Sequence, residues 1–217
     1  MSVDIENLDS CSTKEEVIAK GKKMESWMDE MLADNWTPLS YAHSEIEVSD
    51  RPQEGSILYL KSQTTIKADI KKTFEFLKGG SLENQKNIDK DFLSFELIDI
   101  YDDNTCALGY FLHKAPWPLS NRDFVFVWKW FIKDGCYYLI LESVNSTQHN
   151  TYSNDTVRGF ITVGMKLVPK DDGFVLIRIV KGDPRGNVPS WLASVVKKND
   201  ADCLYHLSSY LPQTFPF

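Results

Sequence analysis

The sequence predicts a single α+β domain over residues 1–217. Short turns rich in Asp, Asn and Gly separate consecutive strand patterns through most of the second half of the chain, which favours antiparallel neighbours. The last part of the chain instead has the three- and four-residue apolar spacing of one long helix. No internal repeat, low-complexity segment or linker divides the sequence, so one domain is expected.

The composition restricts the function classes. Apolar residues make up 42% and charged residues 25% of the chain, as in a globular protein with a sizeable core. The net charge of −7 argues against nucleic acid as a partner and against permanent membrane attachment, since both depend on clustered Lys and Arg. The N-terminal residues lack a signal-peptide pattern, and no stretch approaches 18 apolar residues. We therefore expect a cytoplasmic protein with its four cysteines reduced.

Catalytic and metal-binding patterns are missing from the sequence. It contains no G-x-S-x-G, no P-loop and no H-E-x-x-H, and its four histidines are scattered. We therefore expect neither catalysis nor a cofactor or metal ion.

Two overlapping capping boxes mark the first helix. Ser12 is followed three residues later by Glu15, and Thr13 by Glu16. A helix is expected to continue to about residue 32, with an apolar face made by Val17, Met24, Trp27, Met28, Met31 and Leu32. Gly21 is its expected weak point, because glycine is a poor helix former.

Strands are expected between residues 36 and 67. Polar and apolar residues alternate at 44–48, in parts of 57–60 and at 64–66, and a turn is expected at 50–55.

Two short helices are expected next. Asp69 can cap the first, which Gly79 and Gly80 end, and the second covers about residues 82–90. Six more strands should follow, at 92–101, 105–113, 122–132, 136–145, 157–168 and 174–181. The whole sheet then has about nine strands and must curl to bury its apolar face.

The chain finally reverses at a Gly/Pro turn and enters its longest helix. Asn187 can cap this helix, and Pro189 suits its first turn. Its apolar stripe is Val188, Trp191, Leu192, Val195, Val196, Leu204, Leu207, Tyr210 and Leu211. At 1.5 Å per residue the helix is about 30 Å long, enough to cover the concave side of the sheet.

Two motifs resemble those of a known family. Residues 116–125, PWPLSNRDFV, are similar to the signature loop and strand of START domains, the lipid-transfer domains related to the steroidogenic acute regulatory protein. Residues 182–192, GDPRGNVPSWL, resemble the segment that leads into the family's C-terminal helix, and residues 157–159 fit the segment between the motifs. Both motifs are most similar to the phosphatidylcholine transfer protein branch.

The resemblance implies a helix-grip fold, in which a curved antiparallel sheet wraps around the C-terminal helix and one lipid is enclosed between them. It implies an intracellular carrier that binds and transfers lipid, with transient membrane contact and no catalysis. A phospholipid, a sterol or a fatty acid would suit such a carrier, and the sequence leaves the oligomeric state open. The alternatives are a lipid-sensing module that regulates a protein partner without net transfer, and an enzyme that uses the cavity.

The strand at 122–132 carries an aromatic row. Lys129 indicates that one set of alternate side chains faces outward, so the other set should face inward. The inward set is Phe124, Phe126, Trp128 and Trp130. These rings are either core packing or the wall of a lipid cavity. Many START domains carry Arg at the position of Trp128, so one means of holding a headgroup is missing here.

Gln85 and Asp89 match a family pattern only in part. START domains often show R-x-x-W-D in this helix, and the phosphatidylcholine carrier uses its Arg and Asp at the headgroup. Here Gln85 replaces Arg and Ile88 replaces Trp, while Asp89 remains. Gln85 and Asp89 are therefore candidates for ligand binding or plain helix-surface residues.

Two charged residues interrupt strongly apolar strands. Because a buried charge is costly unless it is paired, Glu142 and Arg178 should each face solvent, pair with one another or meet a lipid headgroup. Trp191 and Val195 complete the candidate ligand-binding residues, as parts of a helical lid over the lipid.

Overall fold

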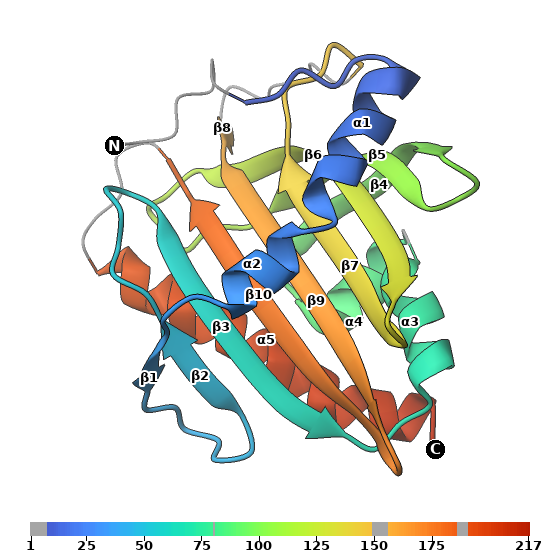
Figure 1. The fold of residues 1–217 in the computed structure, drawn as a ribbon. Coiled ribbons are helices and arrows are strands. Elements are labelled where there is room, and N and C mark those ends of the chain that lie inside the picture. The colour runs from blue at the N-terminus through green and yellow to red at the C-terminus, as the bar shows by residue number, and fades with distance from the viewer. Residues whose placement is uncertain (1–7, 80, 149–155, 186–190) are drawn as a thin grey trace.

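One ten-stranded sheet and five helices make up residues 8–79, 81–148, 156–185 and 191–217, which the computed structural model describes (Figure 1). The helices are α1 (Lys14–Met24), α2 (Trp27–Leu32), α3 (Ile70–Lys78), α4 (Leu82–Ile88) and α5 (Leu192–Thr214). The strands are β1 (Thr37–Leu39), β2 (Glu47–Asp50), β3 (Leu58–Ile66), β4 (Phe92–Tyr101), β5 (Cys106–His113), β6 (Asn121–Lys133), β7 (Cys136–Ser143), β8 (Thr156–Arg158), β9 (Phe160–Lys170) and β10 (Gly173–Asp183).

The sheet follows the order β1-β2-β3-β10-β9-β7-β6-β5-β4. All pairs along this path are antiparallel, as the short turns predicted. β3 pairs with β10, so an early strand and the last strand meet inside the sheet. β8 lies off this path and pairs in parallel with β6.

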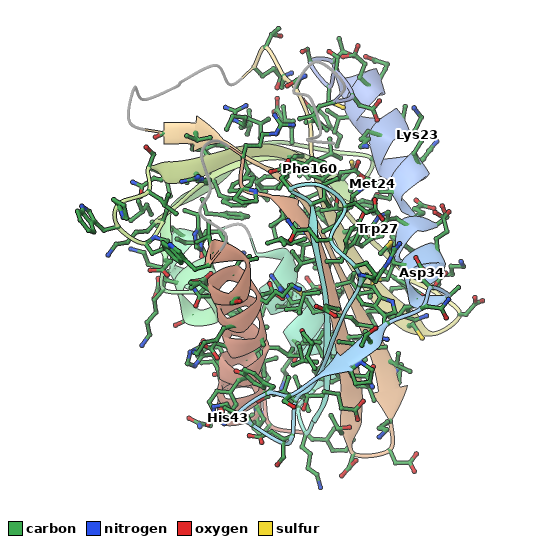
Figure 2. All side chains as sticks on the ribbon, turned by 90° about the vertical axis from the view of Figure 1, so that its left-hand side faces the viewer. Lys23, Met24, Trp27, Asp34, His43 and Phe160 are labelled. Atoms are coloured by element: carbon green, nitrogen blue, oxygen red, sulfur yellow. The ribbon has the colours of Figure 1, made fainter. Side chains whose placement is uncertain are left out.

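Helices cover both faces of the sheet. α1 and α2 lie across one face, and α5 lies across the other (Figure 1). Figure 2 places Met24 and Trp27 on the α1–α2 side and His43 beside α5. The His43 ring stacks on Tyr205 of α5, with ring centroids 3.6 Å apart. This arrangement confirms the predicted helix-grip fold, with ten strands instead of about nine. Among the helices described, none combines the length and apolarity needed to cross a bilayer.

Alternate side chains of the strands build two separate cores. In β6 the aromatic row joins the core under α5, whereas Val125 and Val127 join the core under α1 and α2. The inward direction predicted for the aromatic row is therefore confirmed. Lys129 faces the other way but is only 5% exposed, because its ammonium group pairs with Asp102 at 2.8 Å.

The first helix is shorter than predicted and is followed by a second one. Of the two capping boxes, that of Thr13 and Glu16 forms, with Glu16 N donating to Thr13 Oγ1 at 3.3 Å. The break falls after Met24 and not at the predicted weak point, Gly21. A Cβ at residue 21 would lie 2.8 Å from Cys106 Sγ, so glycine allows the helix to approach β5 closely. The bend lets both Met24 and Met28 lie buried against the sheet.

The predicted strand at 157–168 is divided at Gly159 into β8 and β9. The amide of Gly159 donates to the carbonyl of Asp123 at 3.0 Å, which holds β8 beside β6. A Cβ at residue 159 would lie 2.4 Å from the Phe124 ring, so a side chain does not fit there. Elsewhere, β2 begins three residues later than the strand predicted at 44–48, and residues 58–66 form one continuous strand.

The C-terminal helix begins at Leu192, with Trp191 as its N-cap residue. The predicted cap Asn187 and the predicted first-turn Pro189 lie outside the described residues. Much of the predicted stripe is buried, including Leu192, Leu204, Leu207 and Leu211, whereas Trp191 is 47% exposed. The helix therefore covers the sheet with the predicted face but leaves its first aromatic residue at the surface.

Candidate functional site

A cavity of about 260 Å³ lies between α5 and the inner face of the sheet. Its walls come from β3, β4, β5, β6, β7, β9 and β10, and from α4 and α5. Apolar side chains dominate its lining, among them Leu60, Phe95, Trp128, Leu139, Leu141, Val163, Met165, Val180, Leu192 and Val195. A mainly apolar cavity of this kind suits a hydrophobic ligand with few polar atoms.

The aromatic row is divided between wall and core. Phe124 and Trp128 line the cavity, whereas Phe126 and Trp130 do not. Phe126 is fully buried and packs against neighbouring rings, including Phe95 at a centroid distance of 5.7 Å. Two of the four rings thus line a cavity, and the other two are core packing.

The helix candidates Gln85 and Asp89 both line the cavity. Gln85 is buried, and its side-chain amide donates to the carbonyl of Gly79 at 3.3 Å. Asp89 ends α4, and its carboxylate lies 2.8 Å from Nε2 of His113 at the end of β5. Gln85 and Asp89 are therefore cavity residues. The alternative interpretation, that they are plain helix-surface residues, is wrong.

Arg178 also lines the cavity, while Glu142 does not. Arg178 is one of the alternate residues of β10 that face inward. It lies under α5, where its guanidinium pairs with Asp200. Glu142 lies in β7 and pairs with Lys20 of α1, with 2.7 Å between Nζ and Oε1. The suggested pairing of Glu142 with Arg178 is therefore wrong, since the two side chains have separate partners on α1 and α5.

The two lid candidates differ in position. Val195 lines the cavity, but Trp191 does not. Trp191 precedes the first turn of α5 and stands partly in solvent.

Several cavity residues gave no signal in the sequence. His113, Asp200 and Cys203 line the cavity beside Asp89 and Arg178. His113 is 24 residues from its partner Asp89, so no local spacing could have paired them.

The loop after β5 and the turn after β10 line one end of the cavity, which we call its mouth. Arg122 connects the two segments. Its guanidinium donates to the carbonyl of Ser120 and, at 3.0 Å each, to the carbonyls of Pro184 and Arg185. The loop after β5 carries Trp117, which is 91% exposed.

Electrostatics in the cavity couple Asp89 and His113. Burial acts to raise the pKa of Asp89, but the hydrogen bond and charge of His113 outweigh burial and lower this pKa. Burial likewise acts to lower the pKa of His113, but the hydrogen bond and charge of Asp89 outweigh it and raise this pKa. The charged pair is thus the favoured state at mildly acidic pH.

Raising the pH above about 6.5 should weaken this pair. Because the pKa of His113 is higher in the folded chain, its contribution to stability is complete below the unfolded pKa and is lost as pH rises through the folded pKa. Asp89 contributes above about pH 4, and this contribution is lost as pH falls. We expect the Tm of the wild type to fall relative to that of His113→Asn between about pH 6 and 8. Parallel Tm curves for the two proteins would contradict this assignment.

Comparisons with known proteins agree with this geometry. The family model of the START domain matches residues 81–207. A STAR-related lipid transfer protein fragment from Xanthomonas axonopodis is 28% identical over 83% of this chain and 100% of its own, with a TM-score of 0.69. Human StAR-related lipid transfer protein 5 is 17% identical over 93% of this chain and 99% of its own, with a TM-score of 0.78. Human STARD10 is 19% identical over 90% and 89%, with a TM-score of 0.67. A comparison with curated proteins gave no match.

Proposed function

The chain belongs to the START domain family, and from this we propose that it is a carrier that encloses one lipid under α5 and transfers it between membranes. Lipid binding or transfer is the general activity of this family, and its members generally bind lipid without catalysing a reaction. The observation that carries the proposal is the mainly apolar cavity between α5 and the sheet. We further propose that residues 1–217 act as one lipid-binding domain in the cytoplasm.

The hydrophobic effect explains why such a carrier encloses its cargo. Burying one methylene group stabilises by about 0.8 kcal/mol, so exposing an acyl chain of about 16 carbons costs on the order of 10 kcal/mol. Phe124, Trp128 and Val195 are the proposed contacts for the apolar part of the lipid. Gln85, Asp89 and Arg178 are the proposed contacts for its polar part.

Native mass spectrometry tests this function. The full chain is incubated with vesicles of mixed phospholipid, sterol and fatty acid, re-isolated and weighed intact. One lipid per chain is expected, together with transfer of labelled lipid from donor to acceptor vesicles. No bound lipid and no transfer across the panel would contradict the proposal.

Two exposed indole rings near the cavity mouth are proposed to contact the membrane during exchange. Trp117 is 91% exposed in a loop that lines the mouth, and Trp191 is 47% exposed at the start of α5. Indole rings favour the membrane–water interface.

Replacing both Trp117 and Trp191 by Ala should slow vesicle-to-vesicle transfer roughly tenfold, while the Tm changes little because both rings are exposed. Ile132→Ala is the matched control, since Ile132 is 60% exposed at the opposite end of β6. Transfer that stays at the wild-type rate in the double variant would rule out this membrane contact.

A lipid sensor that acts on a protein partner is the second candidate. Polar contacts connect α5 to β2 and to the segment between β1 and β2. Lys197 forms an ion pair with Asp50 of β2 at 2.6 Å, and Tyr41 donates a hydrogen bond to Asp202 at 2.5 Å. Such contacts favour slow lipid exchange. Acceptor vesicles should raise the lipid off-rate if the chain is a carrier and leave it unchanged if the chain is a sensor.

A further inference from the structure

A buried polar cluster made by Ser62, Arg178 and Asp200 lies under α5, and two of its members, Arg178 and Asp200, line the otherwise mainly apolar cavity. Arg178 comes from β10 and Asp200 from α5, and NH1 of the guanidinium contacts Oδ1 of the carboxylate. The two side chains are only 10% and 11% exposed. Ser62 lies directly opposite Arg178 on β3 and is completely buried. The pair of Arg178 with Asp200 therefore joins β10 to α5, and Ser62 lies beside Arg178 on the neighbouring strand β3.

Three atoms of this cluster have no hydrogen-bond partner among the described residues. They are Nε of Arg178, Oδ2 of Asp200 and Oγ of Ser62. Buried polar atoms in folded proteins are nearly always hydrogen-bonded, because an unmade bond is costly in a dry environment. The cluster lacks a group that accepts a hydrogen bond from Arg178 and donates one to Asp200.

The cluster lies well inside the cavity. Arg178 is five residues before Asp183, the last residue of β10. At about 3.3 Å per residue, this places it about 16 Å along the strand from the mouth. A lipid group bound here is therefore inside the protein.

The charges around the cluster disfavour an anion. Arg178 is already paired with Asp200, and the neighbouring Asp89 with His113. A phosphate or carboxylate near Arg178 would meet two Asp carboxylates, and it would offer no proton to Oδ2 of Asp200.

The other cationic side chains that line the cavity do not belong to this cluster. Arg122 donates to three backbone carbonyls at the mouth, and Lys197 pairs with Asp50. Lys114 lies in the loop at the mouth. An anionic headgroup would thus be held at the mouth and would leave the inner cluster unpaired.

We propose, on the basis of the lipid-binding function above, that the cargo is a neutral lipid whose buried polar group is a hydroxyl or an amide bound between Arg178 and Asp200. The oxygen of this group accepts a hydrogen bond from Nε of Arg178, and its O–H or N–H donates to Oδ2 of Asp200. Sterols, diacylglycerols and ceramides have such a group. Fatty acids and phosphatidic acid carry a charge instead, and the headgroup of phosphatidylcholine has acceptors but no donor.

Competition between dioleoylglycerol and dioleoyl phosphatidic acid tests the class of lipid, because the two differ only in the phosphate. The full chain is incubated with vesicles that contain both at equal amounts, and native mass spectrometry gives the ratio bound. Dioleoylglycerol should exceed phosphatidic acid at least roughly tenfold. An equal or reversed ratio would overturn the assignment. A chain that takes up no lipid from this or the broader panel would instead contradict the proposed function itself.

Asp200→Asn tests the residue. This variant removes the carboxylate that excludes anions and leaves the charge of Arg178 unbalanced, so the bound ratio should move toward phosphatidic acid by roughly tenfold. Asp202→Asn is the matched control on the same helix, because Asp202 pairs with Lys198 and Tyr41 and does not line the cavity. A ratio that stays constant in Asp200→Asn would contradict the role of the carboxylate.

A comparison that needs no variant covers the case in which Asp200→Asn fails to fold. Cholesterol and its 3-methyl ether have the same ring system, but the ether has no proton to donate. The wild-type chain should bind cholesterol roughly tenfold more tightly than the ether. Equal affinities would mean that the donor is not used, and the proposal would fail.

Discussion

Asp123→Asn should lower the free energy of unfolding by about 3–5 kcal/mol, the largest stability effect we expect from a single charge-removing substitution in this chain. Asp123 and Arg158 form a buried, two-fold hydrogen-bonded ion pair. Nε and NH2 of Arg158 lie 3.0 Å and 2.9 Å from the two carboxylate oxygens. The side chains of Asp123 and Arg158 are 0% and 4% exposed.

The cost arises because the substitution removes the carboxylate that accepts two charge-assisted hydrogen bonds from a buried guanidinium. The pair also joins β6 to β8, the two strands that meet in parallel beside the cavity wall. Without the carboxylate, Arg158 either stays buried and loses both of these hydrogen bonds, or displaces β8 as its guanidinium moves toward water. Either result destabilises the folded state much more than the loss of one ordinary hydrogen bond.

Urea unfolding of Asp123→Asn and Asp172→Asn measures the difference. Asp172 pairs with Lys67 at 2.8 Å, but the two side chains are 58% and 74% exposed. Exposed pairs contribute about 0–1 kcal/mol, so Asp172→Asn should unfold almost like the wild type. A loss below about 1 kcal/mol in Asp123→Asn would contradict the importance of this buried pair.

Val163→Trp should abolish lipid binding, with a loss of at least about a hundredfold in affinity and little change in fold. Val163 lies near the centre of the sheet, between Val180 of β10 and Leu141 of β7. All three side chains line the cavity. An indole at this position occupies space that is empty in the free protein, so the lipid and the ring compete for it.

Val175→Trp is the matched control. Val175 is half-buried on the neighbouring strand, alternates with the inward Leu176, and does not line the cavity. It makes the same change on the other face of the sheet, so lipid binding should persist. Native mass spectrometry of both variants after exposure to lipid vesicles gives the result. Wild-type lipid occupancy in Val163→Trp would show that the lipid is bound elsewhere.

Local features of the fold could be predicted from the sequence because they depend on neighbouring residues. The strand at 92–101 and its turn have the predicted bounds, and Asp69 caps α3 through a 2.9 Å hydrogen bond from Lys72 N. The direction of the aromatic row could be inferred from Lys129 alone. Lys129 indicates this direction correctly although it is buried. It faces away from α5, and its ammonium group pairs with Asp102 at the edge of the core under α1 and α2.

Features that join distant segments could not be predicted in this way. The pair of Lys20 with Glu142 spans 122 residues, and it decides that Glu142 belongs to the α1 side of the sheet. The pairing of Arg178 with Asp200 could not be predicted either, because in the sequence Asp200 is one of several polar residues on a long helix. Periodicity shows which residues share a face, but the topology decides which faces meet.

The position of the bound lipid shows whether α5 and the sheet enclose it. A crystal structure of the chain loaded with a lipid that carries bromine atoms on its acyl chain would show them by their anomalous signal. We expect the bromine peaks between α5 and the sheet, in contact with Trp128, Val163 and Val195. Peaks on the α1–α2 face or on the outer surface, with the cavity empty, would contradict the enclosure of lipid under α5.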